Sequence, residues 1–144
     1  MIYIACDHGG LELKKAIKDK LAGRGEDVTD LGTDGEASVD YPDFGYAVAK
    51  KVAQDPSSKG IVICKTGVGM SICANKVKGI RCALCTSVDM GRLCREHNNA
   101  NVLALGAGNT DIGTALEITE AFLNTEFAGG RHAARVDKIM KYEA

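Results

Sequence analysis

The chain has 144 residues and a formal net charge of −1 at pH 7, which is typical of a single domain over residues 1–144 with a substantial core. This near-neutral charge excludes bulk electrostatic attraction to nucleic acid or to an anionic membrane. No apolar run approaches the about 20 residues of a membrane-spanning helix. The first residues lack a signal-peptide pattern, so we expect a cytoplasmic protein.

Short apolar runs alternate with helical patterns along the first half of the chain. Residues 2–6 (IYIAC) are rich in β-formers, and residues 11–25 place leucine and isoleucine at helical spacing before two glycines. Residues 27–32 form a weaker strand pattern. The segment 40–55 predicts a helix that begins near Pro42.

The clearest strand is 59–64 (KGIVIC), whose unbroken apolar run is typical of a parallel strand covered on both faces. The following pattern predicts a helix over 70–76, a strand over 79–85, a helix over 88–96, a strand over 100–106 and helices over 111–125 and 131–143. Strands alternating with helices indicate right-handed βαβ units. We therefore predict an α/β fold, a three-layer α/β/α Rossmann-like domain with a five-stranded parallel sheet.

Polar and glycine residues follow the ends of several predicted strands. Asp7 and His8 follow the first strand, a glycine-bearing loop follows Cys64, and Gly106 to Asn109 follow the fifth strand. In open parallel sheets, ligands bind outside the carboxyl ends of the strands, near the topological switch point. This edge of the sheet is therefore the predicted functional edge.

The loop after Cys64 contains Gly67 and Gly69 but matches no nucleotide-binding motif. A dinucleotide fingerprint requires a third small residue where Ile72 stands, and no Walker sequence is present. A loop that enters a helix presents unpaired amide groups to a phosphate or an oxyanion, and the same field favours a thiolate. Cys64 is therefore a candidate base, with an inert buried cysteine as the alternative.

One sequence pattern has zinc-ligand spacing, with Cys82 and Cys85 followed by Cys94 and His97. Residues three apart on a strand point to opposite faces, so the first two thiols are poorly placed to share an ion. We predict no metal site. The cysteines other than Cys64 are expected to pack as small apolar residues.

Arg131 and Arg135 lie one helical turn apart after two glycines, a spacing that suits a phosphate group. The alternative is a solvated basic helix start. His8, His97 and His132 are the three histidines of the chain, and each alone has an ordinary surface histidine as its alternative.

Five ordered blocks together resemble the type B ribose-5-phosphate isomerases, a family that includes bacterial galactose-6-phosphate isomerase. The blocks are CDHGG (6–10), DYPDF (40–44), TGVGMSICANKVKGIR (66–81), REHNNANVLALG (95–106) and GGRHAARV (129–136). The resemblance implies interconversion of ribose 5-phosphate and ribulose 5-phosphate through a cis-enediolate, without metal or cofactor. It also implies a homodimer or a dimer of dimers with shared active sites.

The resemblance further implies a role for each matching residue. Cys64 is the base, with Thr66 beside it, and Asp7 and His97 handle the sugar, His97 in ring opening. The other assignments are an oxyanion loop of Gly67, Val68, Gly69, Met70 and Ser71, sugar contacts by Tyr41 and Asn98, and phosphate contacts by His8, Arg131 and Arg135. His97 and Asn98 are expected to serve the partner's pocket.

Two positions depart from the family pattern. Lys65 stands where the family usually has glycine, and Gly108 stands where relatives often have a phosphate-binding arginine. We hypothesise that Lys65 supplies a replacement cation, with a solvent-facing lysine as the alternative. Two further functions remain open from the sequence: isomerisation of a six-carbon sugar phosphate such as galactose or allose 6-phosphate, and sugar-phosphate binding without catalysis.

Overall fold

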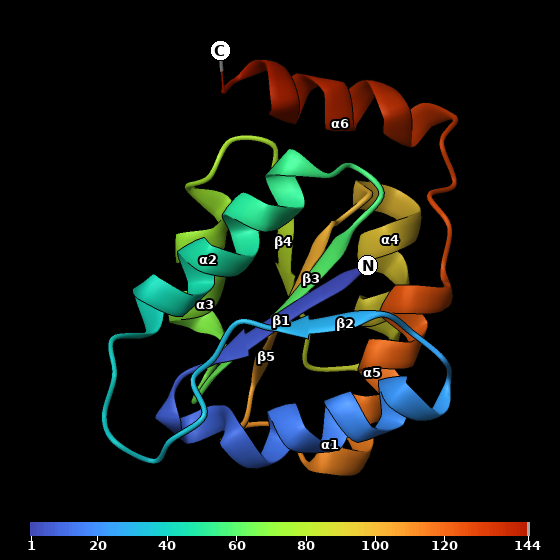
Figure 1. Ribbon diagram of the computed structural model, residues 1–144. Coiled ribbons are helices and arrows are strands. Elements are labelled where there is room, and N and C mark those ends of the chain that lie inside the picture. Colours follow the sequence, from blue (N-terminus) through green and yellow to red (C-terminus); the bar gives the residue numbers. More distant parts are fainter. Residues whose placement is uncertain (144) are drawn as a thin grey trace.

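The computed structural model describes residues 1–143 and contains one five-stranded parallel sheet (Figure 1). The strands are β1 (Ile2–Cys6), β2 (Val28–Asp30), β3 (Lys59–Cys64), β4 (Cys82–Leu84) and β5 (Val102–Gly106). Their order across the sheet is β2-β1-β3-β5-β4, and every neighbouring pair is parallel. The predicted sheet is confirmed, and β3 lies at its centre.

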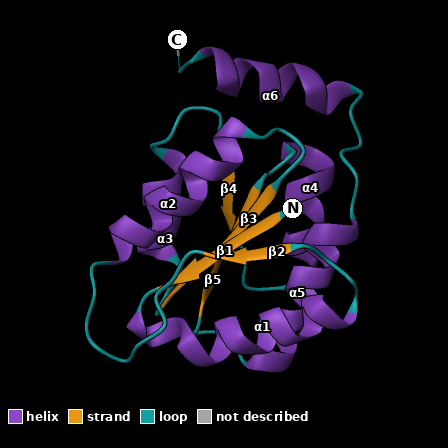
Figure 2. Cartoon of the chain, viewed as in Figure 1, coloured by secondary structure: helices purple, strands orange, loops and turns teal. Residues whose placement is uncertain are grey.

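Helices cover both faces of the sheet, as Figure 2 shows. They are the short 3₁₀ helix η1 (His8–Gly10), then α1 (Leu11–Gly23), α2 (Tyr41–Gln54), α3 (Val68–Asn75), α4 (Val88–Asn98), α5 (Ile112–Asn124) and α6 (Arg131–Lys141). Helices α2 and α3 pack on one face, and α1, α4 and α5 pack on the other. Helix α6 lies apart, across the edge where β3 and β5 begin (Figure 1).

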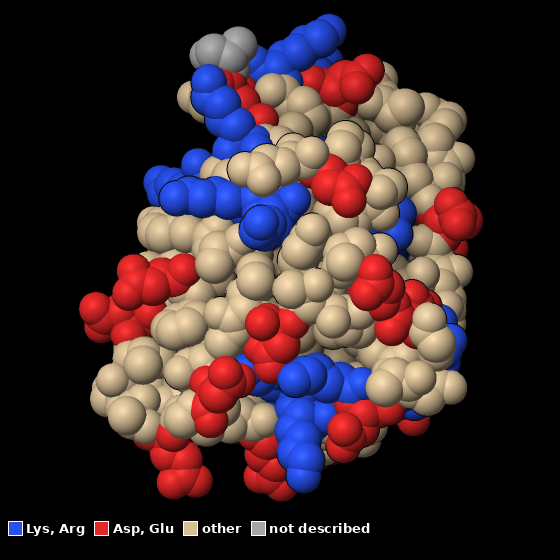
Figure 3. Space-filling model, in the orientation of Figure 1, with Lys and Arg blue, Asp and Glu red and all other residues tan. Residues whose placement is uncertain are grey.

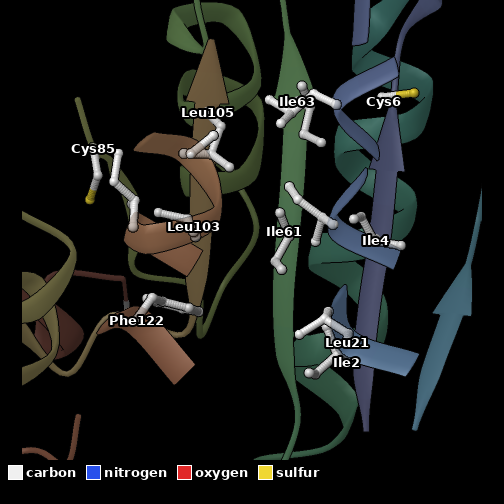
Figure 4. Close-up of a cluster of buried hydrophobic side chains, with 14 of the residues drawn as sticks. Ile2, Ile4, Cys6, Leu21, Ile61, Ile63, Cys85, Leu103, Leu105 and Phe122 are labelled. Atoms are coloured by element: carbon white, nitrogen blue, oxygen red, sulfur yellow. The ribbon is translucent and has the colours of Figure 1, made fainter. Parts of the chain in front are cut away.

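The sheet has a separate hydrophobic core on each face because successive side chains of a strand point in opposite directions. On the face toward α1 and α5, Ile4, Ile61 and Leu103 of three neighbouring strands lie side by side with Phe122 of α5 (Figure 4). The alternate strand residues pack under α2 and α3. Burial on both faces explains the unbroken apolar run of β3.

Strand β4 is shorter than the strand predicted over 79–85. Gly79 has a φ of 88°, so the backbone turns there. The Arg81 amide then donates to the Asn101 side-chain oxygen at 2.8 Å, and the Asn101 amide group donates to the Gly79 carbonyl at 2.9 Å. Before Cys82, the Asn101 side chain thus takes the hydrogen bonds that the backbone of a neighbouring strand would otherwise make, and β4 begins only at Cys82. The other predicted elements end within two residues of the observed ones.

The cysteines outside β3 are divided between the two cores. Cys82 packs on the α2 and α3 side, whereas Cys85 and Cys94 pack on the other side with their sulfurs 3.9 Å apart. Cys82 and Cys85 therefore lie on opposite faces of the sheet, as their spacing of three residues predicts. Within residues 1–143 no group of three or more His, Cys, Asp or Glu side chains is arranged to hold a metal ion. No helix in that range has the length and apolar character to cross a membrane.

Candidate functional site

A cavity of about 360 Å³ opens at the carboxyl edge of the sheet, where β1 and β3 end. Its lining residues are Asp7, Tyr41, Cys64, Lys65, Thr66, Val68, Gly69 and Ile72. They come from the ends of two strands and from the starts of α2 and α3. The structure thus brings together Asp7, Cys64 and part of the loop that follows Cys64, whereas His8 and the segment 106–109 do not line this cavity. Sequence reasoning did not single out Ile72, an exposed apolar side chain at the cavity.

Cys64 is the last residue of β3 and is only 5% exposed. Its sulfur accepts a hydrogen bond from the Gly67 amide at 3.2 Å. Gly67 achieves this with a φ of 78°, and a Cβ at this position would lie 2.5 Å from Leu84 Cδ1. Glycine is therefore required where the chain turns the amide back toward the sulfur. The Gly67 amide and the N-terminus of α3 therefore both lie beside the Cys64 sulfur.

A second thiol also ends a strand, but its surroundings differ. Cys6, the last residue of β1, packs in the core on the side of α1 and α5. Burial raises the pKa of Cys6 to about 11. Cys6 is therefore protonated at neutral pH, and Cys64 is the cysteine that lines the cavity.

The amide groups at the start of α3 are not all available to a ligand. The Ser71 amide donates to the Gly67 carbonyl at 3.0 Å, which is the first helical hydrogen bond. The assignment of Ser71 to the oxyanion loop stays a prediction, and its amide is already paired in the single chain. The Gly67 amide donates to the Cys64 sulfur, and the Val68 amide donates to the Thr66 hydroxyl at 3.3 Å.

The amides of Gly69 and Met70 make no hydrogen bond within residues 1–143. The ring of Tyr41 covers Gly69 closely, since a Cβ there would lie 2.5 Å from the Tyr41 Cε1 atom. The absence of a side chain at Gly69 therefore allows the Tyr41 ring to lie against the backbone at the unpaired Gly69 amide. The Gly69 and Met70 amides both lie in the first turn of the helix that follows the Cys64 loop, and unpaired amides at such a helix start can stabilise an oxyanion.

Asp7 and His8 follow β1 but occupy different surroundings. Asp7 is 8% exposed, and its Oδ1 atom accepts a hydrogen bond from the Gly9 amide at 2.9 Å. This cap fixes the carboxylate, which lines the cavity. The His8 ring instead accepts a hydrogen bond from the Val39 amide at 3.2 Å and is not among the lining residues.

Lys65 follows Cys64 and lines the cavity. Its backbone φ is negative, as for every non-glycine residue in 1–143 except Asn99, so a side chain at this position causes no backbone strain. Its side chain lies against Gly108: a Cβ at 108 would be 3.0 Å from Lys65 Cγ. The Gly108 amide also donates to the Lys65 carbonyl at 2.8 Å. The two departures from the family pattern are therefore in direct contact.

The other predicted site residues lie at the opposite edge of the sheet. Cys64 is level with Gly106 in the register, whereas α4 ends before β5 begins. The length of β5 alone separates the two edges by about 13 Å. Because the helices run antiparallel to the strands, the last turn of α4 returns to the amino edge. His97 and Asn98 end α4, and Arg131 and Arg135 belong to α6, whose His132 ring stacks on the His97 ring.

The predicted phosphate set is therefore divided within one chain, with His8 at the carboxyl edge and both arginines on α6. At the amino edge the rings of His97 and His132 are stacked, with centroids 4.4 Å apart. Loss of hydration and the positive charges of His97 and of both arginines lower the pKa of His132. Sequence reasoning gave His132 no role, although it lies within the GGRHAARV block.

Both the sequence and the structure of this chain are similar to those of known proteins. The sequence model described as Ribose/Galactose Isomerase matches residues 2–139. The chain belongs to the ribose/galactose isomerase family. Within this family it is 42% identical to ribose-5-phosphate isomerase B of Escherichia coli K12, over 99% of this chain and 95% of that protein. The resemblance predicted from the five sequence blocks is confirmed.

Solved structures of the family agree with the fold. Ribose-5-phosphate isomerase B of Clostridium thermocellum is 54% identical, with a TM-score of 0.96 over 99% of this chain and 96% of that one. The enzyme of Mycoplasma genitalium, solved with bound ribulose-5-phosphate, is 46% identical. Its TM-score is also 0.96, over 99% of this chain and 95% of that one.

Proposed function

We propose that this protein is an aldose-ketose isomerase that interconverts ribose 5-phosphate and ribulose 5-phosphate, with Cys64 as the base. The observation that carries the proposal is the geometry at Cys64: a nearly buried sulfur that accepts the Gly67 amide hydrogen bond, beside a cavity and two unpaired amides. The relative from Mycoplasma genitalium that binds ribulose-5-phosphate supports the choice of a five-carbon substrate.

The reaction is a proton transfer within the open-chain sugar. The Cys64 thiolate removes the proton from C2, and the C1 carbonyl becomes the oxyanion of a cis-enediolate. The Gly69 and Met70 amides donate to this oxygen. The thiol then returns the proton to C1, while the hydroxyl proton on O2 moves to O1. No electron acceptor is required, so we expect no cofactor.

Asp7 and Tyr41 line the same cavity and are suited to the sugar hydroxyls. The capped Asp7 carboxylate accepts hydrogen bonds, and the phenol of Tyr41 both donates and accepts. The Thr66 hydroxyl accepts a hydrogen bond from the Val68 amide and so helps to hold the loop that follows Cys64. These residues position the open chain so that C2 meets the Cys64 sulfur.

The residues at the amino edge complete the site of a second copy in a homodimer or a dimer of dimers. His97 of one subunit acts in ring opening, Asn98 contacts the sugar, and Arg131 and Arg135 bind the phosphate together with the partner's His8. The exposure of α6 supports this assembly. Only Val136 of α6 is buried in the single chain, and Ile139 is 53% exposed. We expect this enzyme to act in the cytoplasm.

Replacement of the base tests the proposal. We expect Cys64→Ala to lower kcat for ribose 5-phosphate by about 10³-fold, because a positioned base contributes about 10²- to 10⁴-fold. The variant should also lose deuterium incorporation into the sugar from D₂O. Cys82→Ala is the matched control, since Cys82 lies outside this cavity. Near-normal turnover by Cys64→Ala would contradict the assigned role and would favour another base.

Two comparisons separate this function from its alternatives. The ratio of kcat/KM for ribose 5-phosphate to that for galactose 6-phosphate or allose 6-phosphate decides between five- and six-carbon substrates, and we expect it to exceed tenfold. A protein that only binds sugar phosphates would show ligand-induced stabilisation without deuterium exchange.

A further inference from the structure

A second cavity, of about 390 Å³, lies at the amino edge of the sheet, away from Cys64. Three of its lining residues are cations: Lys59 begins β3, Arg81 precedes β4, and Arg95 lies near the end of α4. The remaining lining residues are Val52, Ala53, Pro56, Ser58, Gly79, Asn99, Asn101 and Met140. Figure 3 shows further Lys and Arg side chains gathered toward the end of the molecule where α2 ends and α6 lies.

The positive charge of this cavity has little local compensation. In the part of the chain that the structure describes, none of the three cations forms an ion pair with a carboxylate. The Glu143 carboxylate, which partly offsets the positive charge at Arg81, accepts the Gly79 amide hydrogen bond at 3.0 Å. Burial, followed by repulsion from Arg95, lowers the pKa of both Lys59 and Arg81. Glu26 and Glu126 offset part of this repulsion at Lys59.

The two guanidinium groups are held in place by hydrogen bonds on one side. Arg95 is only 7% exposed, and its Nη1 atom donates to the Asn99 side chain at 2.9 Å while Nε donates to the Thr125 carbonyl at 3.1 Å. Arg81 Nε donates to the Asn99 carbonyl at 2.9 Å. The Nη2 atoms of both arginines make no hydrogen bond within residues 1–143. The cavity therefore contains fixed cationic groups with unused donors.

We propose that this cavity binds the phosphate group of a small molecule. Guanidinium groups present planar pairs of N–H donors that match phosphate oxygens, and the Lys59 ammonium adds a mobile point charge. A phosphate dianion would relieve the mutual repulsion of the three cations. The site shares no lining residue with the cavity at Cys64, and its lining residues include none of the amino-edge residues His97, Asn98, Arg131 and Arg135 assigned above to the isomerase site.

Lys59 is the residue to replace, because its ammonium makes no hydrogen bond or ion pair in the described chain and its loss should leave the fold intact. The ¹⁵N-labelled protein is titrated with inorganic phosphate at constant ionic strength, and amide shifts are recorded. We expect saturable shifts at Gly79, Asn99 and Asn101. Lys59→Gln should weaken this binding by about tenfold, as for one charged hydrogen bond.

The control variant is Lys50→Gln, an exposed lysine of α2 outside both cavities, which should bind phosphate as the parent protein does. A parallel titration with ribose 5-phosphate, followed at the Gly79, Asn99 and Asn101 amides and not at the Cys64 cavity, distinguishes a phosphorylated metabolite from free phosphate by its tighter binding at these amides. Shifts reproduced by sodium chloride, equal affinity in Lys59→Gln, or shifts confined to Gly69 and Met70 would overturn the proposal. The last result would leave the isomerase function intact, so the two proposals fail separately.

Discussion

At the scale of single residues, the site depends on which backbone amides of the loop after Cys64 already donate hydrogen bonds within the chain. The sequence indicates a glycine loop after Cys64, but the hydrogen-bond partners of the loop amides follow from the positive φ of Gly67 and the start of α3 at Val68. Whether Ser71 is a free donor is decided by where the helical bonding begins, which sequence patterns locate only within one or two residues. The candidate base was therefore predictable, and the identity of the free donors was not.

The contact between Lys65 and Gly108 leads to a prediction at this scale. If Lys65 supplies a cation to the cavity, Lys65→Gly should raise KM for ribose 5-phosphate by about ten- to a hundredfold, because a charged contact to the phosphate contributes about 1.5–3 kcal/mol. Lys65→Arg should retain most of the affinity. Steady-state kinetics measure both variants. Unchanged constants in Lys65→Gly would make Lys65 a solvent-facing lysine without a role in the reaction.

At the scale of elements, α1 is tied to the sheet by a buried ion pair. The Lys14 ammonium lies 2.8 Å from Asp30 Oδ1 and the Lys18 ammonium 2.8 Å from Oδ2. Burial of Asp30 favours its neutral form, but the hydrogen bonds from both lysines and from the Gly32 amide outweigh burial and lower its pKa. The sequence pattern predicted α1 and β2, but it carries no signal for this pair, because Lys14 and Asp30 meet only through the packing of α1 beside the edge strand.

The lowered pKa of Asp30 gives a stability prediction with a defined sign. A carboxyl group whose pKa is lower in the folded state stabilises the fold above its unfolded pKa of about 3.9, and this contribution is lost as the pH falls through the folded value. We expect Asp30→Asn to be destabilised at pH 7, with a difference from the parent protein that shrinks below pH about 4. Urea unfolding at several pH values measures it, with exposed Asp137→Asn as control. A difference that is constant down to pH 3 would contradict this role of Asp30.

At the scale of the whole molecule, the sheet separates the predicted residues into two groups. Strand order and the three layers follow from the alternation of strand and helix patterns, so the positions of Asp7 and Cys64 at one edge were predictable. His97 and Asn98 end a helix, and a helix that follows a parallel strand returns to the opposite edge. The same logic explains why one chain does not bring Arg131 to Cys64. A second copy of the chain brings the two groups together in the account proposed above.

Complementation between two inactive variants tests this shared site most directly. Cys64→Ala and His97→Ala are each expected to have little activity on ribose 5-phosphate, and the two are unfolded together and refolded as a mixture. In a mixed dimer, one site receives both lesions and the other receives an intact Cys64 and an intact His97 from different subunits. Random pairing therefore predicts recovery of about one quarter of the parent activity. A mixture as inactive as its components, with mixed dimers verified by mass spectrometry, would contradict a site shared between subunits.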